Sequence, residues 1–138
     1  MAGRSVHVTR VYHFSAAHQL ASAALSAADN AALYGACHRL HGHNYYLEVT
    51  VAGTPDARTG MAVDVDALDG HVRRAVLEQV DHAQLEEAPA LAGVITTGES
   101  LARAFWHALA PGMPTGRLSR VTVVETAKNR FEYRGEDA

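Results

Sequence analysis

The sequence predicts an α+β domain in which an antiparallel sheet is covered on one face by two helices. Alternating apolar residues near both ends of the chain are typical of strands. Between them, two stretches repeat apolar residues three or four apart, as amphipathic helices do. The order strand, strand, strand, helix, helix, strand, strand favours this architecture over alternating strands and helices. The 138 residues are expected to form one domain, 1–138.

Two long strands are predicted from period-two patterns, and a short third one from the turn that precedes it. The first begins near Val6 and keeps one parity as far as His18. The second covers 41–51, and Gly60–Asp64 is expected to return as the other strand of a hairpin. Between the first two strands, residues 21–36 are rich in alanine and are expected to form a long excursion with one helical turn near 26–33. Loops of this length are often functional.

Two helices and two further strands follow. Asp66 is expected to cap a helix whose apolar residues lie four apart and which ends before Asp81. A second helix should begin near Thr97, where Thr96 and Glu99 have capping-box spacing, and run to about Leu109. Residues 120–126 and the alternation around 131–133 predict the last two strands.

Composition narrows the function classes. Hydrophobic residues make up 48%, charged residues 20%, and the formal net charge is −3, which describes an ordinary soluble protein without the basic character that draws nucleic acid. A single cysteine cannot form an intrachain disulfide, which suits a reducing compartment. No signal pattern or membrane-spanning run is evident, so we expect a cytoplasmic protein with no membrane partner.

The segment from Cys37 to His43 points to a metal site. His41 and His43 lie two apart at the start of a strand and therefore share its apolar face, and His18 ends the first strand on a similar parity. Neutral imidazole is a common zinc ligand, and three protein ligands leave a fourth position open for water or substrate. We therefore predict that His18, His41 and His43 bind zinc.

Other polar residues have both structural and functional interpretations. Asp81 beside His82 could orient and activate the imidazole for proton transfer. Glu125 follows the parity of a buried strand face and needs a partner there, either in a structural ion pair or in a planar ligand with adjacent N–H groups. Thr97 and Glu99 fit a helix N-terminus without any ligand.

Six blocks in this order resemble the 6-pyruvoyl-tetrahydropterin synthase family, which includes the bacterial 6-carboxy-tetrahydropterin synthases of queuosine biosynthesis. The blocks are 14–18, 37–45, 60–64, 81–82, 97–100 and 125–126. The resemblance implies the tunnelling fold (T-fold), in which a four-stranded antiparallel sheet carries two helices. It also implies a homo-oligomer, a hexamer built as a dimer of trimers, with active sites between subunits.

The resemblance further implies residue roles. His18, His41 and His43 would be the zinc ligands, and Cys37 would be a catalytic thiol acting with Asp81 and His82 in proton transfer. Glu125 would bind the amino-pyrimidine edge of a pterin, assisted by Thr97 and Glu99. The implied small-molecule substrate is 7,8-dihydroneopterin triphosphate, and loss of triphosphate makes the enzyme a carbon–oxygen lyase.

Two features bear on the product. Three residues separate Cys37 from His41, as in the carboxy-forming enzymes, whereas the long segment 25–35 resembles animal-type, pyruvoyl-forming enzymes of tetrahydrobiopterin biosynthesis. The interpretation favoured here is 6-carboxy-5,6,7,8-tetrahydropterin with release of acetaldehyde; the alternative is 6-pyruvoyl-tetrahydropterin. A non-catalytic metal- and pterin-binding paralogue is the alternative of another class. A zinc hydrolase is disfavoured because the chain lacks a His-Glu-x-x-His motif.

Overall fold

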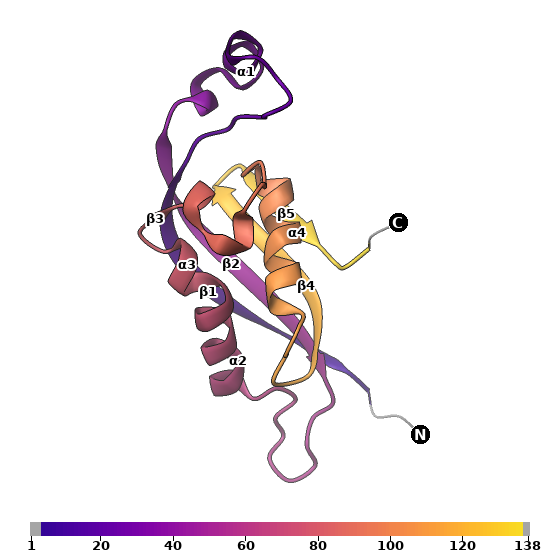
Figure 1. Ribbon diagram of the computed structural model, residues 1–138. Helices are drawn as coiled ribbons and strands as arrows, with labels where there is room; N and C mark the ends of the chain where they lie inside the picture. Colours follow the sequence, from indigo (N-terminus) through magenta and orange to yellow (C-terminus); the bar gives the residue numbers. More distant parts are fainter. Residues whose placement is uncertain (1–3, 137–138) are drawn as a thin grey trace.

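Five strands form one sheet in the computed structural model, which describes residues 4–136 (Figure 1). Their order across the sheet is β3-β1-β2-β4-β5. The bounds are Val6–His18 for β1, His41–Gly53 for β2, Ala83–Gln84 for β3, Arg117–Thr126 for β4 and Asn129–Tyr133 for β5. All neighbours pair antiparallel except β1 and β3, which are parallel. The predicted α+β class and four long antiparallel strands are confirmed, and the two-residue β3 is an addition that sequence periodicity did not show.

The long β1–β2 hairpin determines how the histidines meet. Its register runs without interruption from Val6 opposite Gly53 to His18 opposite His41. Because side chains alternate between faces, His18, His41 and His43 all lie on the face that also carries buried Phe14 and Tyr45. The face is therefore apolar along most of its length and ends in three imidazoles.

The helices cover this same face. The α2 helix (Val65–Val72) continues through a π turn at Arg73–Leu77 into α3 (Glu78–Val80), and α4 (Gly98–Leu109) lies beside them (Figure 1). At the centre of the core, the Phe14 ring stacks on Tyr45 with centroids 4.7 Å apart and meets Phe105 edge-on at 6.0 Å. These three side chains are fully buried. The prediction of two helical segments on one face, the first ending before Asp81, is confirmed.

The loop between β2 and α2 differs from the prediction. Gly60–Asp64 forms no strand, because Asp56 closes a compact turn: its N–H donates to the Met61 carbonyl and its own carbonyl accepts from the Gly60 N–H. The helix N-cap is Asp64, whose carboxylate accepts from the Ala67 N–H at 3.1 Å, and not Asp66. Local turn chemistry therefore outweighs the short apolar pattern.

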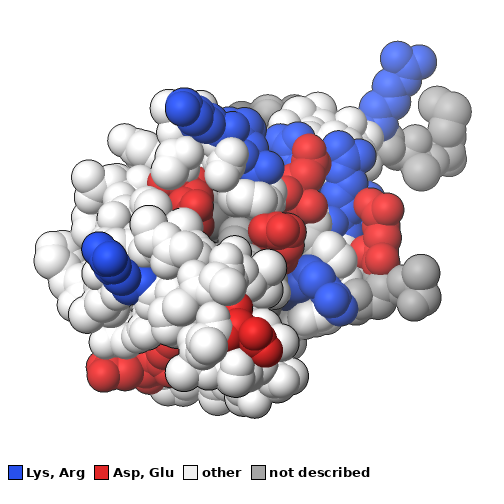
Figure 2. Space-filling view, turned by 90° about the horizontal axis from the view of Figure 1, so that it is seen from above, with Lys and Arg blue, Asp and Glu red and all other residues white. Residues whose placement is uncertain are grey.

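The excursion after β1 forms a helical cap at one end of the sheet. The α1 helix (Ala27–Tyr34) is capped by Ser26 and is longer than the single turn expected near 26–33, and a 3-10 turn at Gly35–His38 returns the chain to β2. Figure 1 shows α1 projecting beyond the strands. Seen from this end in Figure 2, much of the surface on the left is uncharged, and most of the visible basic and acidic side chains lie intermixed towards the right. Within residues 4–136, no helix has the length and apolar character needed to cross a membrane.

Two short 3-10 turns, Leu85–Glu87 and Pro89–Leu91, lead towards α4. The α4 N-cap is Thr97, whose hydroxyl accepts from the Ser100 N–H at 3.3 Å. The expected capping box between Thr96 and Glu99 is therefore wrong. Thr96 is instead buried, and its hydroxyl donates to Glu86.

Candidate metal centre and active site

Three histidines from two strands form a compact cluster. The candidate ligand nitrogens of His18, His41 and His43 all lie within 4.8 Å of one another. The ring centroids are 4.5 Å apart for His18 and His41, 5.1 Å for His18 and His43, and 4.9 Å for His41 and His43. This spacing suits a single metal ion bound by three imidazoles.

Backbone carbonyls orient two of these rings. The Nδ1 of His18 lies 3.0 Å from the Thr96 carbonyl oxygen, and the Nδ1 of His41 lies 2.6 Å from that of Arg39. A carbonyl oxygen only accepts, so each Nδ1 carries the proton and donates it. The Nε2 atoms are thereby left unprotonated, which is the arrangement that metal-binding histidines need.

The surroundings of His18 and His43 favour their neutral forms. Burial, followed by the proximity of His41, lowers the pKa of His18 to about 4, and burial likewise lowers the pKa of His43. A neutral imidazole can bind a metal, whereas a protonated one cannot. The chemistry of the donor set therefore fits a divalent metal at neutral pH.

A tyrosine and a carboxylate lie beside the cluster on its inner side. Tyr45 is fully buried, its hydroxyl lies 3.3 Å from His18 Nε2, and burial and the negative charge of Glu125 raise its pKa. The same Glu125 charge acts on His43 and opposes the lowering of its pKa. Glu125 thus lies at the edge of the histidine cluster, as its strand parity predicts, and remains half-buried.

Cys37 lies apart from the three histidines. It sits exposed in the 3-10 turn Gly35–His38, where its carbonyl accepts from the Leu20 N–H at 2.9 Å. The group of residues close enough to share a metal does not include it.

Asp81 and His82 form a rigid pair at the β1 edge. One Asp81 oxygen, Oδ1, accepts from the Ser15 N–H and from His82 Nδ1, both at 3.0 Å, while the His82 N–H donates to the Ser15 carbonyl at 2.7 Å. The hydrogen bond from Ser15 is the main cause of a lowered pKa at Asp81, so the carboxylate stays ionised. His82 has a positive φ of 59°, an uncommon conformation for a residue other than glycine, and its side chain is 83% exposed.

The chain does not bring Cys37 and His82 together. The backbone of His82 is hydrogen-bonded to Ser15 within β1, whereas that of Cys37 is hydrogen-bonded to Leu20, beyond the end of β1. The part of β1 from Ser15 to His18 alone spans about 10 Å of extended chain. The two predicted parts of the proton-transfer group are therefore separated within one chain.

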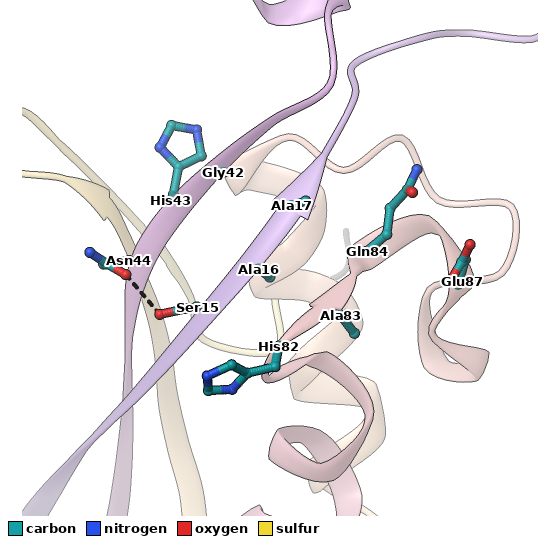
Figure 3. Close-up of a pocket in the computed structure, with 10 residues that line it drawn as sticks. All are labelled: Ser15, Ala16, Ala17, Gly42, His43, Asn44, His82, Ala83, Gln84 and Glu87. Carbon is teal, nitrogen blue, oxygen red and sulfur yellow. Dashed lines mark hydrogen bonds between the residues drawn. The ribbon is translucent and has the colours of Figure 1, made fainter.

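A hollow of about 680 Å³ connects the pair to the histidine cluster, because both His43 and His82 line it (Figure 3). The figure shows His43 on β2 and His82 in the segment before β3 at two sides of the hollow, with the hydrogen-bonded Ser15 and Asn44 between them. The hollow is open enough to admit a small molecule and is bordered by polar groups.

The predicted pterin-binding residues of α4 have clear structural roles. Thr97 caps the helix, and Glu99 is exposed in its first turn. Their position directly after Thr96, which contacts His18, places the helix N-terminus close to the histidine cluster.

Three residues of this site lay outside the predicted site set: Tyr45, Thr96 and Glu86. Strand parity places Tyr45 on the face of His41 and His43, so its position was predictable. Thr96 and Glu86 meet the site through contacts between segments far apart in the chain, and no local pattern marks them.

Comparisons with known proteins agree with this geometry. The family model described as 6-pyruvoyl tetrahydropterin synthase matches residues 7–136. The 6-pyruvoyl tetrahydrobiopterin synthase of Homo sapiens is 39% identical over 132 residues, covering 94% of this chain and 91% of that protein. The protein of the same name from Poecilia reticulata is 38% identical over 138 residues, covering 98% and 94%.

A solved structure shows the same fold. The 6-pyruvoyl tetrahydropterin synthase of Caenorhabditis elegans superimposes with a TM-score of 0.92 at 34% identity, covering 99% of each chain. The tunnelling fold expected from the resemblance is thus confirmed. With its family model, its relatives and its fold in agreement, the chain belongs to the 6-pyruvoyl tetrahydropterin synthase family and is a lyase of that family.

Proposed function

We propose that this protein is a zinc-dependent 6-pyruvoyl-tetrahydropterin synthase that acts on 7,8-dihydroneopterin triphosphate and releases triphosphate. The observation that carries this proposal is the cluster of His18, His41 and His43, with ligand atoms within 4.8 Å, in a chain 38–39% identical to proteins named as such synthases. The named relatives favour the pyruvoyl product over the carboxy product that the Cys37 to His41 spacing suggested.

The three histidines would hold zinc through Nε2 of His18 and His41 and one ring nitrogen of His43. Bound zinc supplies Lewis-acid chemistry, which acidifies protons next to oxygens that it coordinates. Carbonyls that hold two rings in a single orientation reduce the reorganisation needed for binding. The buried side of the site, formed by Tyr45, excludes water from one flank.

Cys37 would act as the base that moves protons between the pterin ring and its side chain. Asp81 holds Nδ1–H of His82, so the His82 Nε2 is free to exchange a proton. Since Cys37 and His82 lie far apart in one chain and both are exposed, we place the working relay between subunits, with the Asp81–His82 pair of one copy facing Cys37 of another.

Oligomerisation into a hexamer of two trimers belongs to this proposal. The sheet face away from the helices exposes Val11 and Tyr46, which are 58% and 47% accessible. Among residues 4–136, the outer edge of β5 also pairs with no further strand. Apolar side chains and an open strand edge are features that another copy can cover.

The carboxylate of Glu125 would accept from the amino-pyrimidine edge of the pterin. It is half-buried beside His43 and Tyr45, where an acceptor for two adjacent N–H groups is well placed. Thr97 and Glu99 would assist from the N-terminus of α4. These roles follow the family resemblance together with the position of Glu125.

The product can be identified by mass spectrometry after incubation of zinc-loaded protein with 7,8-dihydroneopterin triphosphate. We expect inorganic triphosphate and a pyruvoyl pterin. A carboxylated pterin with acetaldehyde would assign the protein to the carboxy-forming branch. Zinc binding without triphosphate release would contradict catalysis and favour a non-catalytic binding protein.

A further inference from the structure

We propose that Glu86 is a positioning residue for the metal centre, which acts through the Thr96 hydroxyl to determine which nitrogen of His18 carries the proton. The inference rests on the proposed metal site and assigns a role to two residues outside the ligand set. Three consecutive hydrogen-bonded groups, Glu86, Thr96 and His18, carry it.

Glu86 is anchored from three sides. Its Oε1 accepts from the Gln19 N–H at 2.9 Å and from Gln84 Nε2 at 3.2 Å, while its Oε2 accepts from the Thr96 hydroxyl at 2.8 Å. These contacts join the turn Leu85–Glu87 to the end of β1 and to the segment before α4. The carboxylate is therefore fixed in place and presents one oxygen to Thr96.

The Thr96 hydroxyl has one proton to donate. A carboxylate only accepts, so this proton points to Glu86, and a lone pair of Oγ1 is left facing His18 Nδ1, 3.2 Å away. The Thr96 carbonyl accepts from the same nitrogen at 3.0 Å. Both oxygens favour a proton on Nδ1, which keeps Nε2 unprotonated for the metal. Thr96 and His18 are 0% and 1% exposed, so water does not compete for these bonds.

The substitution Glu86→Gln reverses this arrangement with almost no change in size. An amide has an accepting oxygen and a donating nitrogen, and the Gln19 N–H at the end of β1 still requires the oxygen. The amide nitrogen then faces Thr96, whose hydroxyl must accept from it and turn its own proton towards His18 Nδ1. A hydroxyl that donates to Nδ1 favours the proton on Nε2, where it blocks metal binding.

Zinc affinity, measured by competition with a chelating indicator, tests the inference. We expect Glu86→Gln to weaken zinc binding by about 10- to 100-fold, the usual effect of losing a group that orients a ligand. The matched control is Glu87→Gln, which makes the same change at the exposed neighbouring carboxylate and should bind zinc as the wild type does. Equal affinity in the two variants would overturn the proposal.

A double-mutant cycle separates this mechanism from general loosening of the turn. Thr96→Val removes the hydroxyl but keeps the carbonyl that accepts from His18. In Glu86→Gln/Thr96→Val no hydroxyl proton can be turned towards Nδ1, so the double variant should bind zinc more tightly than Glu86→Gln alone. If the losses of zinc affinity in the two single variants simply add in the double variant, Glu86 acts only by holding the fold.

Nitrogen-15 NMR of His18 in the metal-free wild type provides a readout that needs no variant. We expect the proton on Nδ1, and a majority of protein with the proton on Nε2 would overturn the proposal. In Glu86→Gln the Nε2–H form should increase. Wild-type protein that shows these properties yet releases no triphosphate would contradict the proposed function and leave this inference standing.

Discussion

Acid should destabilise the metal-free protein through His18. The imidazole is 1% exposed, and its pKa falls from 6.5 to about 4, chiefly because of burial and secondarily because of His41. Between these two pH values the unfolded chain binds a proton at this position and the folded chain does not. The free energy of unfolding therefore decreases as the pH falls from 6.5 towards 4 and then levels off.

The size of the effect follows from the two pKa values. At about 1.4 kcal/mol per pKa unit, this difference corresponds to roughly 3 kcal/mol of stability that is present above pH 6.5 and lost by pH 4. This is a large share of the total stability of a typical domain.

Urea unfolding of the metal-free protein, followed by circular dichroism at fixed protein concentration between pH 7 and 4, measures the effect. His18→Gln removes the titrating group. The free energy of unfolding of this variant should therefore change by roughly 3 kcal/mol less than that of the wild type between pH 6.5 and 4. His7→Gln, on the exposed face of β1, is the control and should retain the wild-type slope. A His18→Gln protein with unchanged pH dependence would refute the reasoning.

Three further outcomes are expected. If the Cys37 thiol transfers protons, Cys37→Ala should keep bound zinc but lower kcat by at least about 100-fold. Metal analysis and an assay of triphosphate release measure these two properties, and full turnover in the variant would exclude that role. Asp69→Asn should lower stability by about 1 kcal/mol at pH 7, because Asp69 accepts from Arg10 and Tyr12 at 2.8 and 2.6 Å. The hydrogen bond from Arg10 is the main cause of the lowered pKa of Asp69, so the difference from the wild type in urea midpoints should shrink as the pH drops below about 4. Phe105→Ala should cost about 3–5 kcal/mol in urea unfolding, since the ring is fully buried; a loss below 1 kcal/mol would contradict its central place in the core.

Local patterns predicted most elements correctly. Alternation placed β1 and β2, because side-chain direction depends on residues a few positions apart. The prediction of a strand at Gly60–Asp64 failed because a short apolar segment after a turn is weaker evidence than the turn hydrogen bonds around Asp56. The two-residue β3 has no periodicity to detect and exists only because it lies against β1.

The sequence by itself determined that His41 and His43 share the apolar face of their strand and that His18 lies on the apolar face of its own, since a period of two is a local property of extended chain. Only the tertiary structure decided the register that sets His18 opposite His41, and the contacts of Thr96 and Glu86 that orient its ring. It also decided that Cys37 and His82 lie apart. These features join segments that lie tens of residues apart in the chain. They depend on how the helices pack on the sheet, and the spacing of residues along the chain does not encode that packing.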